Sequence, residues 1–138
     1  DDMEKQGLGI IFHSGSYDRI SHGLFLVLAA LALGREGKLF FSYWALEYLK
    51  KEGSPGLRLD SEAEKARGAL EKNRKRGHLQ TVEELISQAK AMGAKFYVCT
   101  HSMGLVNIAR DEFSDAVDKS MGITTFLTET VGYQVLFI

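Results

Sequence analysis

The alternation of short apolar runs with helical patterns is the feature that most constrains the fold of this chain. Apolar runs of strand length occupy Leu8–Phe12, Lys38–Tyr43, Lys95–Thr100, Thr124–Thr128 and Gln134–Ile138. Helical patterns separate them over Arg19–Leu33, Trp44–Lys51, Ser61–Arg76, Thr81–Gly93, Ser102–Ala109 and Asp115–Met121. Strands that alternate with helices in this way form a parallel sheet with right-handed crossovers. The sequence therefore predicts an α/β fold whose sheet is covered on both faces.

Length and charge narrow the class of protein. A chain of 138 residues fits one domain, so we expect residues 1–138 to form a single unit. Lys and Arg number 17 and Asp and Glu 18, a formal net charge of −1 that argues against a nucleic-acid-binding protein. The longest apolar stretch, Gly23–Gly34, is shorter than the ~20 residues of a membrane helix, and the N-terminal segment has no signal-peptide pattern. We therefore expect a cytoplasmic protein without membrane insertion.

Two segments differ in composition from the rest. Residues 50–80 are rich in charge, with nine Lys or Arg and five Asp or Glu between Lys50 and Arg76, and we expect them to form a mobile insertion. The basic cluster Lys72–Arg76 within them either attracts anions or is a solvated helix face, and the second reading is favoured. Ile20–Leu33 is apolar nearly all round, which predicts a helix packed on the sheet on one side and on a second subunit on another.

Cys99 is the most informative single residue. It ends a predicted strand directly before a predicted helix, where unpaired N–H groups and the helix dipole favour a thiolate. His101, two residues further on, adds positive charge if it points the same way. The alternative is that Cys99 is a small buried apolar residue, which is common for a free cysteine. A chain with one cysteine has neither an intramolecular disulfide nor a Cys-x-x-Cys redox pair, and the histidine spacing predicts no metal site.

Further candidates follow the first two predicted strands. Ligands of open parallel sheets bind at the carboxyl ends of the strands. His13, Ser14 and Gly15 follow the first strand. One hypothesis is that His13 faces Cys99 across neighbouring strands and holds a proton or binds an anionic sulfur substrate; the alternative is a structural histidine. Tyr43 and Trp44, at the end of the second, line either the pocket mouth or a subunit interface. His22, within the apolar helix, is interpreted as a core or interface residue.

The residues around Cys99 resemble a known family. FYVCTHSMGL contains the short motif Cys-x-x-Ser-Met of DsrE/DsrF-like proteins, and LGIIFHSGSYDRISHGL and GITTFLTETVGYQVLFI are similar to the branch found beside sulfur-oxidation genes. The resemblance covers most of the chain, least distinctively in the charged middle. It implies a three-layer α/β/α fold with a five-stranded, mainly parallel sheet, and homo-oligomers, for which we expect a trimer or hexamer. Such proteins are often labelled oxidoreductases or peroxiredoxin-like, but no second cysteine is present to resolve an oxidised thiol.

The resemblance also implies a function. It makes Cys99 the residue that accepts sulfane sulfur as a persulfide or thiosulfonate and passes it to a partner thiol, as in a sulfur carrier or sulfurtransferase. Catalytic roles are then expected for Cys99 and His101, and substrate contacts for His13, Ser14, Gly15, Tyr43, Ser102 and Met103. We expect a small sulfur donor and sulfur-relay proteins as partners, and no cofactor or metal. Two alternatives stay open: a non-catalytic nucleotide- or flavin-binding module, and a structural subunit of a redox complex.

Overall fold

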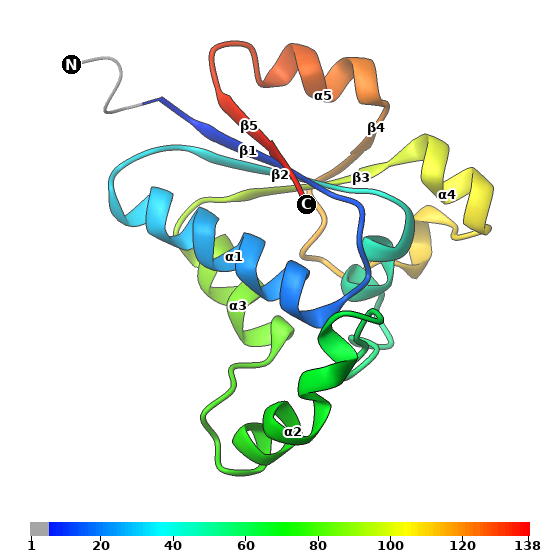
Figure 1. The fold of residues 1–138 in the computed structure, drawn as a ribbon. Helices are drawn as coiled ribbons and strands as arrows, with labels where there is room; N and C mark the ends of the chain where they lie inside the picture. The colour runs from blue at the N-terminus through cyan, green and yellow to red at the C-terminus, as the bar shows by residue number, and fades with distance from the viewer. Residues whose placement is uncertain (1–5) are drawn as a thin grey trace.

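A five-stranded sheet forms the centre of the computed structural model, which describes residues 6–138 (Figure 1). Every strand is parallel to its neighbours, in the order β4-β3-β2-β1-β5. The strands are β1 (Leu8–Phe12), β2 (Gly37–Phe41), β3 (Lys95–Cys99), β4 (Lys119–Met121) and β5 (Gln134–Phe137). The predicted α/β class is confirmed. The N-terminal segment, where the sequence shows no signal-peptide pattern, lies outside the described residues.

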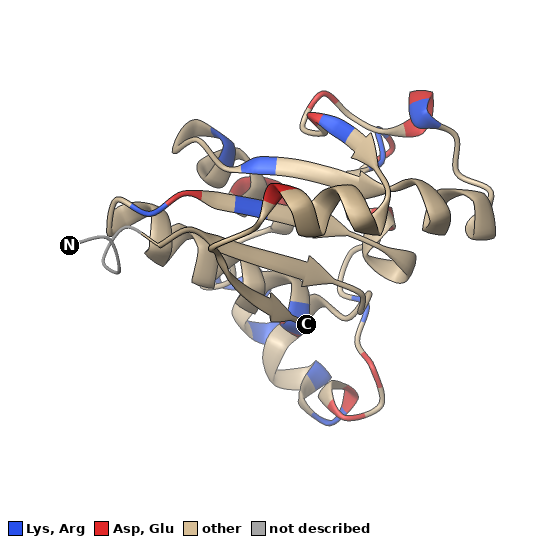
Figure 2. Ribbon diagram, turned by 90° about the horizontal axis from the view of Figure 1, so that it is seen from above, with Lys and Arg blue, Asp and Glu red and all other residues tan. Residues whose placement is uncertain are grey.

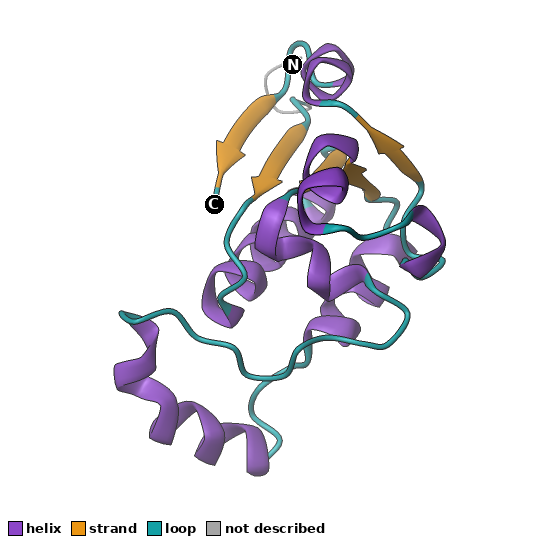
Figure 3. Ribbon diagram, turned by 90° about the vertical axis from the view of Figure 1, so that its right-hand side faces the viewer, coloured by secondary structure: helices purple, strands orange, loops and turns teal. Residues whose placement is uncertain are grey.

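Helices cover the two faces of the sheet unequally. The α-helices are α1 (Tyr17–Ala32), α2 (Arg67–Lys75), α3 (Val82–Ala91), α4 (Thr100–Val106) and α5 (Ile123–Glu129), and the 3₁₀ helices are Tyr43–Leu49, Ala63–Ala66 and Arg110–Glu112. α1 and α3 lie side by side under one face, α5 lies on the other, and α2 stands away from the sheet (Figures 1 and 3). In the described chain, no helix combines the length and apolar character needed to cross a membrane.

The two faces carry separate apolar clusters. The face under α1 and α3 buries the larger cluster, which includes the sheet residues Ile10, Phe12, Leu39, Phe41, Phe96 and Val98. The opposite face buries a smaller cluster, of Phe40, Tyr97, Cys99, Met121 and Phe126, with Ile11 packed against it. Because side chains alternate along a strand, Val98 and Cys99 point to different faces. Cys99 therefore lies on the face that α5 covers.

The first helix begins earlier than the sequence predicts. It starts at Tyr17 with Ser16 at the N-cap position, and Asp18 lies in its first turn. Gly23 allows this helix to approach the sheet closely, because a Cβ atom there would come within 2.3 Å of the Phe12 ring. His22 is exposed in the monomer, which excludes a core position and leaves its interpretation as an interface residue a prediction.

The order of the last two predicted elements before β5 is reversed. Asp115–Met121, predicted as a helix, contains β4, and Thr124–Thr128, predicted as a strand, lies within α5. Residues 119–121 form a strand because they pair with β3, and the Asp118 carboxylate fixes the start of β4 by accepting a hydrogen bond from the Phe96 N–H at 2.8 Å. Residues 123–129 form a helix, α5, because this buries Phe126 against the sheet, and this burial outweighs the strand preference of the threonines.

Three further helices differ in type or length from their predictions. Trp44–Lys51 is 3₁₀ rather than α-helical, over Tyr43–Leu49. Ser61–Arg76 is divided into a 3₁₀ turn and α2, and Ser102–Ala109 is replaced by α4, which ends where Asn107 adopts a left-handed conformation with φ of 56°. α3 is capped by Thr81, whose hydroxyl accepts a hydrogen bond from the Glu84 N–H at 3.1 Å.

Candidate functional site

Cys99 occupies the junction between β3 and α4. It is the last residue of the strand and the N-cap of the helix, with no loop between them. Its Sγ accepts a hydrogen bond from the backbone N–H of Ser102 at 3.4 Å. The side chain is 1% exposed. The thiol is therefore held by a backbone donor but is closed off from solvent in this conformation.

Ser102 is buried beside Cys99, and its side chain lacks a partner. The residue is 0% exposed, and its hydroxyl makes no hydrogen bond within residues 6–138. A buried hydroxyl without a partner costs about 1–3 kcal/mol of stability, so such groups are rare in folded proteins. The Ser102 hydroxyl therefore adds an unused polar group to surroundings of Cys99 that are otherwise mainly apolar.

The other two candidates on α4 face away from this junction. His101 is exposed, and no hydrogen bond joins it to Cys99 in the described part of the chain. Met103 is half-buried and packs against the cluster on the α1 and α3 side of the sheet. Of the four residues proposed on this segment, the fold brings together only Cys99 and Ser102.

His13 lies two strands away from Cys99, because β2 runs between β1 and β3. The registers Phe12↔Phe41 and Phe41↔Val98 set His13 and Cys99 at the same level with Ser42 between them. At ~4.8 Å between adjacent strands, their backbones are roughly 10 Å apart. The expectation that His13 faces Cys99 across neighbouring strands is therefore wrong.

His13 belongs instead to an aromatic group at the ends of β1, β2 and β5. Its ring lies 4.7 Å from that of Tyr43 and 5.8 Å from that of Phe137. Tyr43 has a φ of 46°, a strained conformation for a residue with a side chain. Trp44 extends the group, with its ring 5.7 Å from that of Tyr43.

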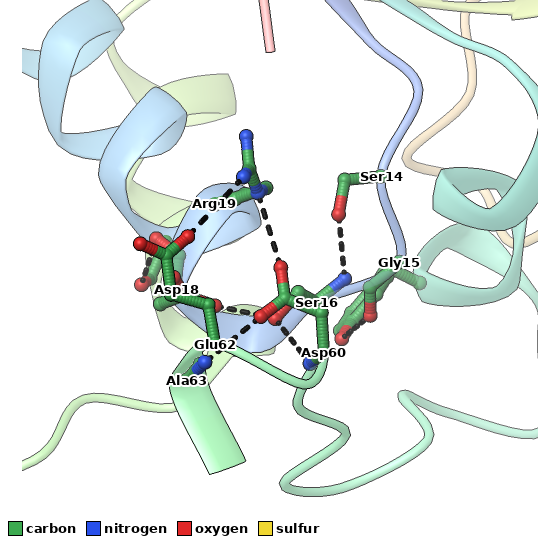
Figure 4. A network of polar contacts seen from close by, with 10 residues as sticks. Ser14, Gly15, Ser16, Asp18, Arg19, Asp60, Glu62 and Ala63 are labelled. Atoms are coloured by element: carbon green, nitrogen blue, oxygen red, sulfur yellow. Dashed lines mark hydrogen bonds and ion pairs between the residues drawn. The ribbon is translucent and has the colours of Figure 1, made fainter. Parts of the chain in front are cut away.

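Ser14 and Gly15 belong to a loop fastened by polar contacts (Figure 4). The Ser14 hydroxyl accepts from the Ser16 N–H at 3.0 Å, and the Ser16 hydroxyl accepts from the Asp60 N–H at 3.0 Å. Asp60 also receives the Arg19 Nε–H at 3.2 Å. The charged middle segment is thus bonded at Asp60 to the loop after β1 and to Arg19.

Charged and buried groups around this loop have shifted pKa values. The hydrogen bond from the Ala63 N–H holds the pKa of Asp60 below its ordinary value. Burial raises the pKa of Tyr48 to about 12, and its hydroxyl donates to the Gly15 carbonyl at 2.7 Å. Both groups stabilise the loop in the form that they hold at neutral pH.

An open cavity of about 320 Å³ lies beside the loop and is lined by Ser14, Gly15, Ser16, Trp44, Arg58, Leu59 and Asp60. Sequence reasoning missed Arg58, because nothing in its neighbourhood indicates that residues 58–60 return to the end of β1. It finds Ser14, Gly15 and Trp44 from their position after strands. Within residues 6–138, no group of three or more His, Cys, Asp or Glu is placed to hold a metal ion.

Comparison with known proteins connects this geometry to a family. Residues 65–137, which include Cys99 and Ser102, match the DsrE/DsrF/DrsH-like family. The chain belongs to this family. It is 25% identical over 139 residues to the sulfur carrier protein DsrE2 of Allochromatium vinosum, covering 84% of this chain and 87% of that protein.

Solved structures support the fold of the DsrE/DsrF/DrsH-like chain. The ychN protein of E. coli matches with a TM-score of 0.68 at 12% identity, over 96% of this chain and 97% of that one. MTH1491 of Methanobacterium thermoautotrophicum, described as a protein of unknown function, matches with a TM-score of 0.63 at 12% identity, over 96% and 99%. The three-layer α/β/α architecture is therefore confirmed.

Proposed function

We propose that this protein is a sulfur carrier whose Cys99 thiolate accepts sulfane sulfur and passes it to a partner thiol. The observation that carries the proposal is the Ser102 N–H at 3.4 Å from Sγ, a donor placed where negative charge on sulfur would lie. Membership of the DsrE/DsrF/DrsH-like family and likeness to a sulfur carrier protein support it.

The chemistry is nucleophilic displacement at sulfur, without an external oxidant or reductant. With thiosulfate, the Cys99 thiolate attacks the outer sulfur and sulfite leaves, giving a Cys99 persulfide anion. With tetrathionate, it attacks a central sulfur and thiosulfate leaves, giving a thiosulfonate. In the second half of the cycle, a partner thiolate attacks the outer sulfur of the persulfide and the Cys99 thiolate leaves.

Access to Cys99 requires a local opening, because the side chain is 1% exposed. α5 is the element best suited to open. It has seven residues, and Phe126 is its only buried residue. Elements with few buried contacts open at a small fraction of the global unfolding free energy. We propose that α5 moves away from the sheet when a donor or acceptor reaches the thiol.

A second copy of the chain is the proposed cover for the outer side of α5 and β5. Exposed apolar side chains gather there: Ile123, Leu127, Val131, Val135 and Phe137. Glu129 is the one charged residue between Gly122 and Ile138, and β5, which ends at the C label in Figure 2, carries none. Parallel sheets are almost always covered on both faces, so an uncharged partner surface, such as the same face of another copy, fits best.

The burial of Cys99 also favours a second candidate function, a structural subunit of a redox complex with an unreactive cysteine. The two functions differ in what the native thiol does. A carrier forms a covalent adduct with a sulfur donor, whereas a structural subunit does not.

Intact-protein mass spectrometry separates the two. The protein is exposed to thiosulfate, tetrathionate or polysulfide, beside Cys99→Ser as the matched control. A carrier gains the mass of a sulfur or thiosulfonate group that a reductant removes and that Cys99→Ser never acquires. Folded protein that gains no mass with any donor would reject the carrier function in favour of the structural one.

A further inference from the structure

We propose that the Ser102 hydroxyl is the binding group for the outer sulfur of a Cys99 persulfide. The inference rests on the proposed carrier function and names the form in which the sulfur is held. It starts from the hydroxyl at 0% exposure that makes no hydrogen bond within the described residues.

The position of the hydroxyl relative to Cys99 is constrained by covalent geometry. The Ser102 nitrogen lies 3.4 Å from the Cys99 Sγ, and only Cα and Cβ separate that nitrogen from the hydroxyl oxygen. Covalent geometry therefore keeps the hydroxyl oxygen within about 7 Å of Sγ, and the hydroxyl makes no hydrogen bond to it. A persulfide extends the side chain by one S–S bond of about 2 Å, and we infer that its outer sulfur comes within reach of this unused donor.

The outer sulfur needs such a donor. A persulfide anion at this position lies among Phe40, Tyr97, Met121 and Phe126, a largely apolar cluster. Burying an anion in apolar surroundings is costly unless hydrogen bonds compensate it. The backbone N–H of Ser102 already bonds to Sγ, and the side-chain hydroxyl of the same residue is a buried donor without a partner that is available to the outer atom.

The enclosed setting favours the smaller form of the loaded cysteine. Cys99 is 1% exposed and Ser102 is 0% exposed, and a single added sulfur atom needs less additional space there than a sulfonate group does. The loading reaction is attack of the Cys99 thiolate on the outer sulfur of a low-molecular-weight persulfide. The new S–S bond forms as the old one breaks, and the donor leaves as a thiolate, with no net oxidation.

In the unloaded protein, the unpartnered Ser102 hydroxyl lowers the stability of the fold. Replacing Ser102 by alanine removes a buried hydroxyl that has no partner, which is neutral or stabilising. The thermal midpoint of Ser102→Ala is therefore expected to equal or exceed that of the wild type by a few degrees. A residue that destabilises the unloaded protein but stabilises the loaded one is typical of a functional site.

The test measures how sulfur is distributed between the protein and glutathione persulfide. Wild type, Ser102→Ala and Ser21→Ala are equilibrated with glutathione persulfide and glutathione, and the loaded fraction is read by intact mass. Ser21 is the matched control, a buried serine whose hydroxyl already bonds to the Asp18 carbonyl at 3.2 Å. Ser102→Ala is expected to lower the loading equilibrium constant about tenfold, as for loss of one hydrogen bond to a charged group. Ser21→Ala is expected to leave it unchanged.

Alkylation of the unloaded thiol distinguishes this role from a structural one. We expect iodoacetamide to modify Cys99 at similar rates in the wild type and Ser102→Ala. Equal loading of the two proteins would overturn the proposal, and so would a parallel fall in loading and alkylation, because the hydroxyl would then act on the thiol or the fold. If the wild type forms no persulfide, the carrier function itself fails, and the inference with it.

Discussion

Phe126→Ala tests how Cys99 reaches solvent. Phe126 is 0% exposed, and its ring stacks on Phe40 with centroids 4.7 Å apart and meets the edge of Tyr97 at 6.3 Å. It is the only buried residue of α5. Truncating it removes the apolar anchor that holds this helix over the Cys99 cluster.

The expected magnitude follows from the loss of that anchor. Truncation of a fully buried phenylalanine costs about 3–5 kcal/mol. What still holds α5 is weaker, such as the partly exposed Lys38–Glu129 ion pair at 3.3 Å, a type worth roughly 0–1 kcal/mol. If opening of α5 exposes Cys99, a loss of ~3 kcal/mol raises the open population about 100-fold. The rate of Cys99 modification then rises by the same factor.

The assay is the rate of Cys99 alkylation by iodoacetamide, read by intact mass at a temperature where circular dichroism shows folded protein. Leu127→Ala is the matched control, because Leu127 lies next to Phe126 on the same helix but is 52% exposed. We expect the control to react within about twofold of the wild-type rate, the effect of a surface substitution. If folded Phe126→Ala reacts at the wild-type rate, opening of α5 does not control access to Cys99, and movement of α4 becomes the alternative route.

Three further predictions concern assembly and pH. Phe137→Asp places a charge on the exposed apolar face, so light scattering at micromolar concentration should show a multimer for the wild type and a smaller species for the variant; a monomeric wild type contradicts the proposed assembly. The pKa of Asp60 is lowered in the folded state, so its contribution to stability is present above the ordinary pKa of 3.8 and is lost as the pH falls through the folded pKa. In thermal melts, Asp60→Asn should therefore lose less stability than the wild type on acidification. Equal losses would contradict this. The pKa of Tyr48 is raised from 10.0 to about 12, so this residue stabilises the fold below pH 10 and its contribution to stability is lost as the pH rises toward 12. Thermal melts of Tyr48→Phe should therefore show a smaller loss of stability at alkaline pH than the wild type. An equal loss would argue against the pKa shift.

The central strands could be predicted because their sequence patterns are local. The apolar runs predicted as strands at Leu8–Phe12, Lys38–Tyr43 and Lys95–Thr100 all form strands, β1, β2 and β3. β4 and α5 could not be assigned in the same way. β4 has three residues and exists through its pairing with β3, whereas α5 has seven residues and is fixed by the burial of one side chain. Neither interaction is visible in a short window of sequence.

The candidate site was predictable in part for the same reason. The junction of Cys99 with α4 follows from a strand followed at once by a helix, and the N-cap geometry then places the Ser102 N–H on its sulfur. The burial of Cys99 depends on α5, which was predicted as a strand. Arg58 joins the loop after β1 only because a distant segment returns to it, and such a contact leaves no local signal.

The strand order has a consequence for biosynthesis. β5 pairs with β1, so Leu8 meets Gln134 from near the other end of the described chain. The chain is synthesised from the N-terminal side, and a single domain generally folds as a unit. A nascent chain that has emerged as far as Met121 contains four of the five strands and the whole of α4, but not α5. During that interval α5 is absent and cannot cover the Cys99 cluster, so the thiol becomes enclosed only after the C-terminal helix has been made.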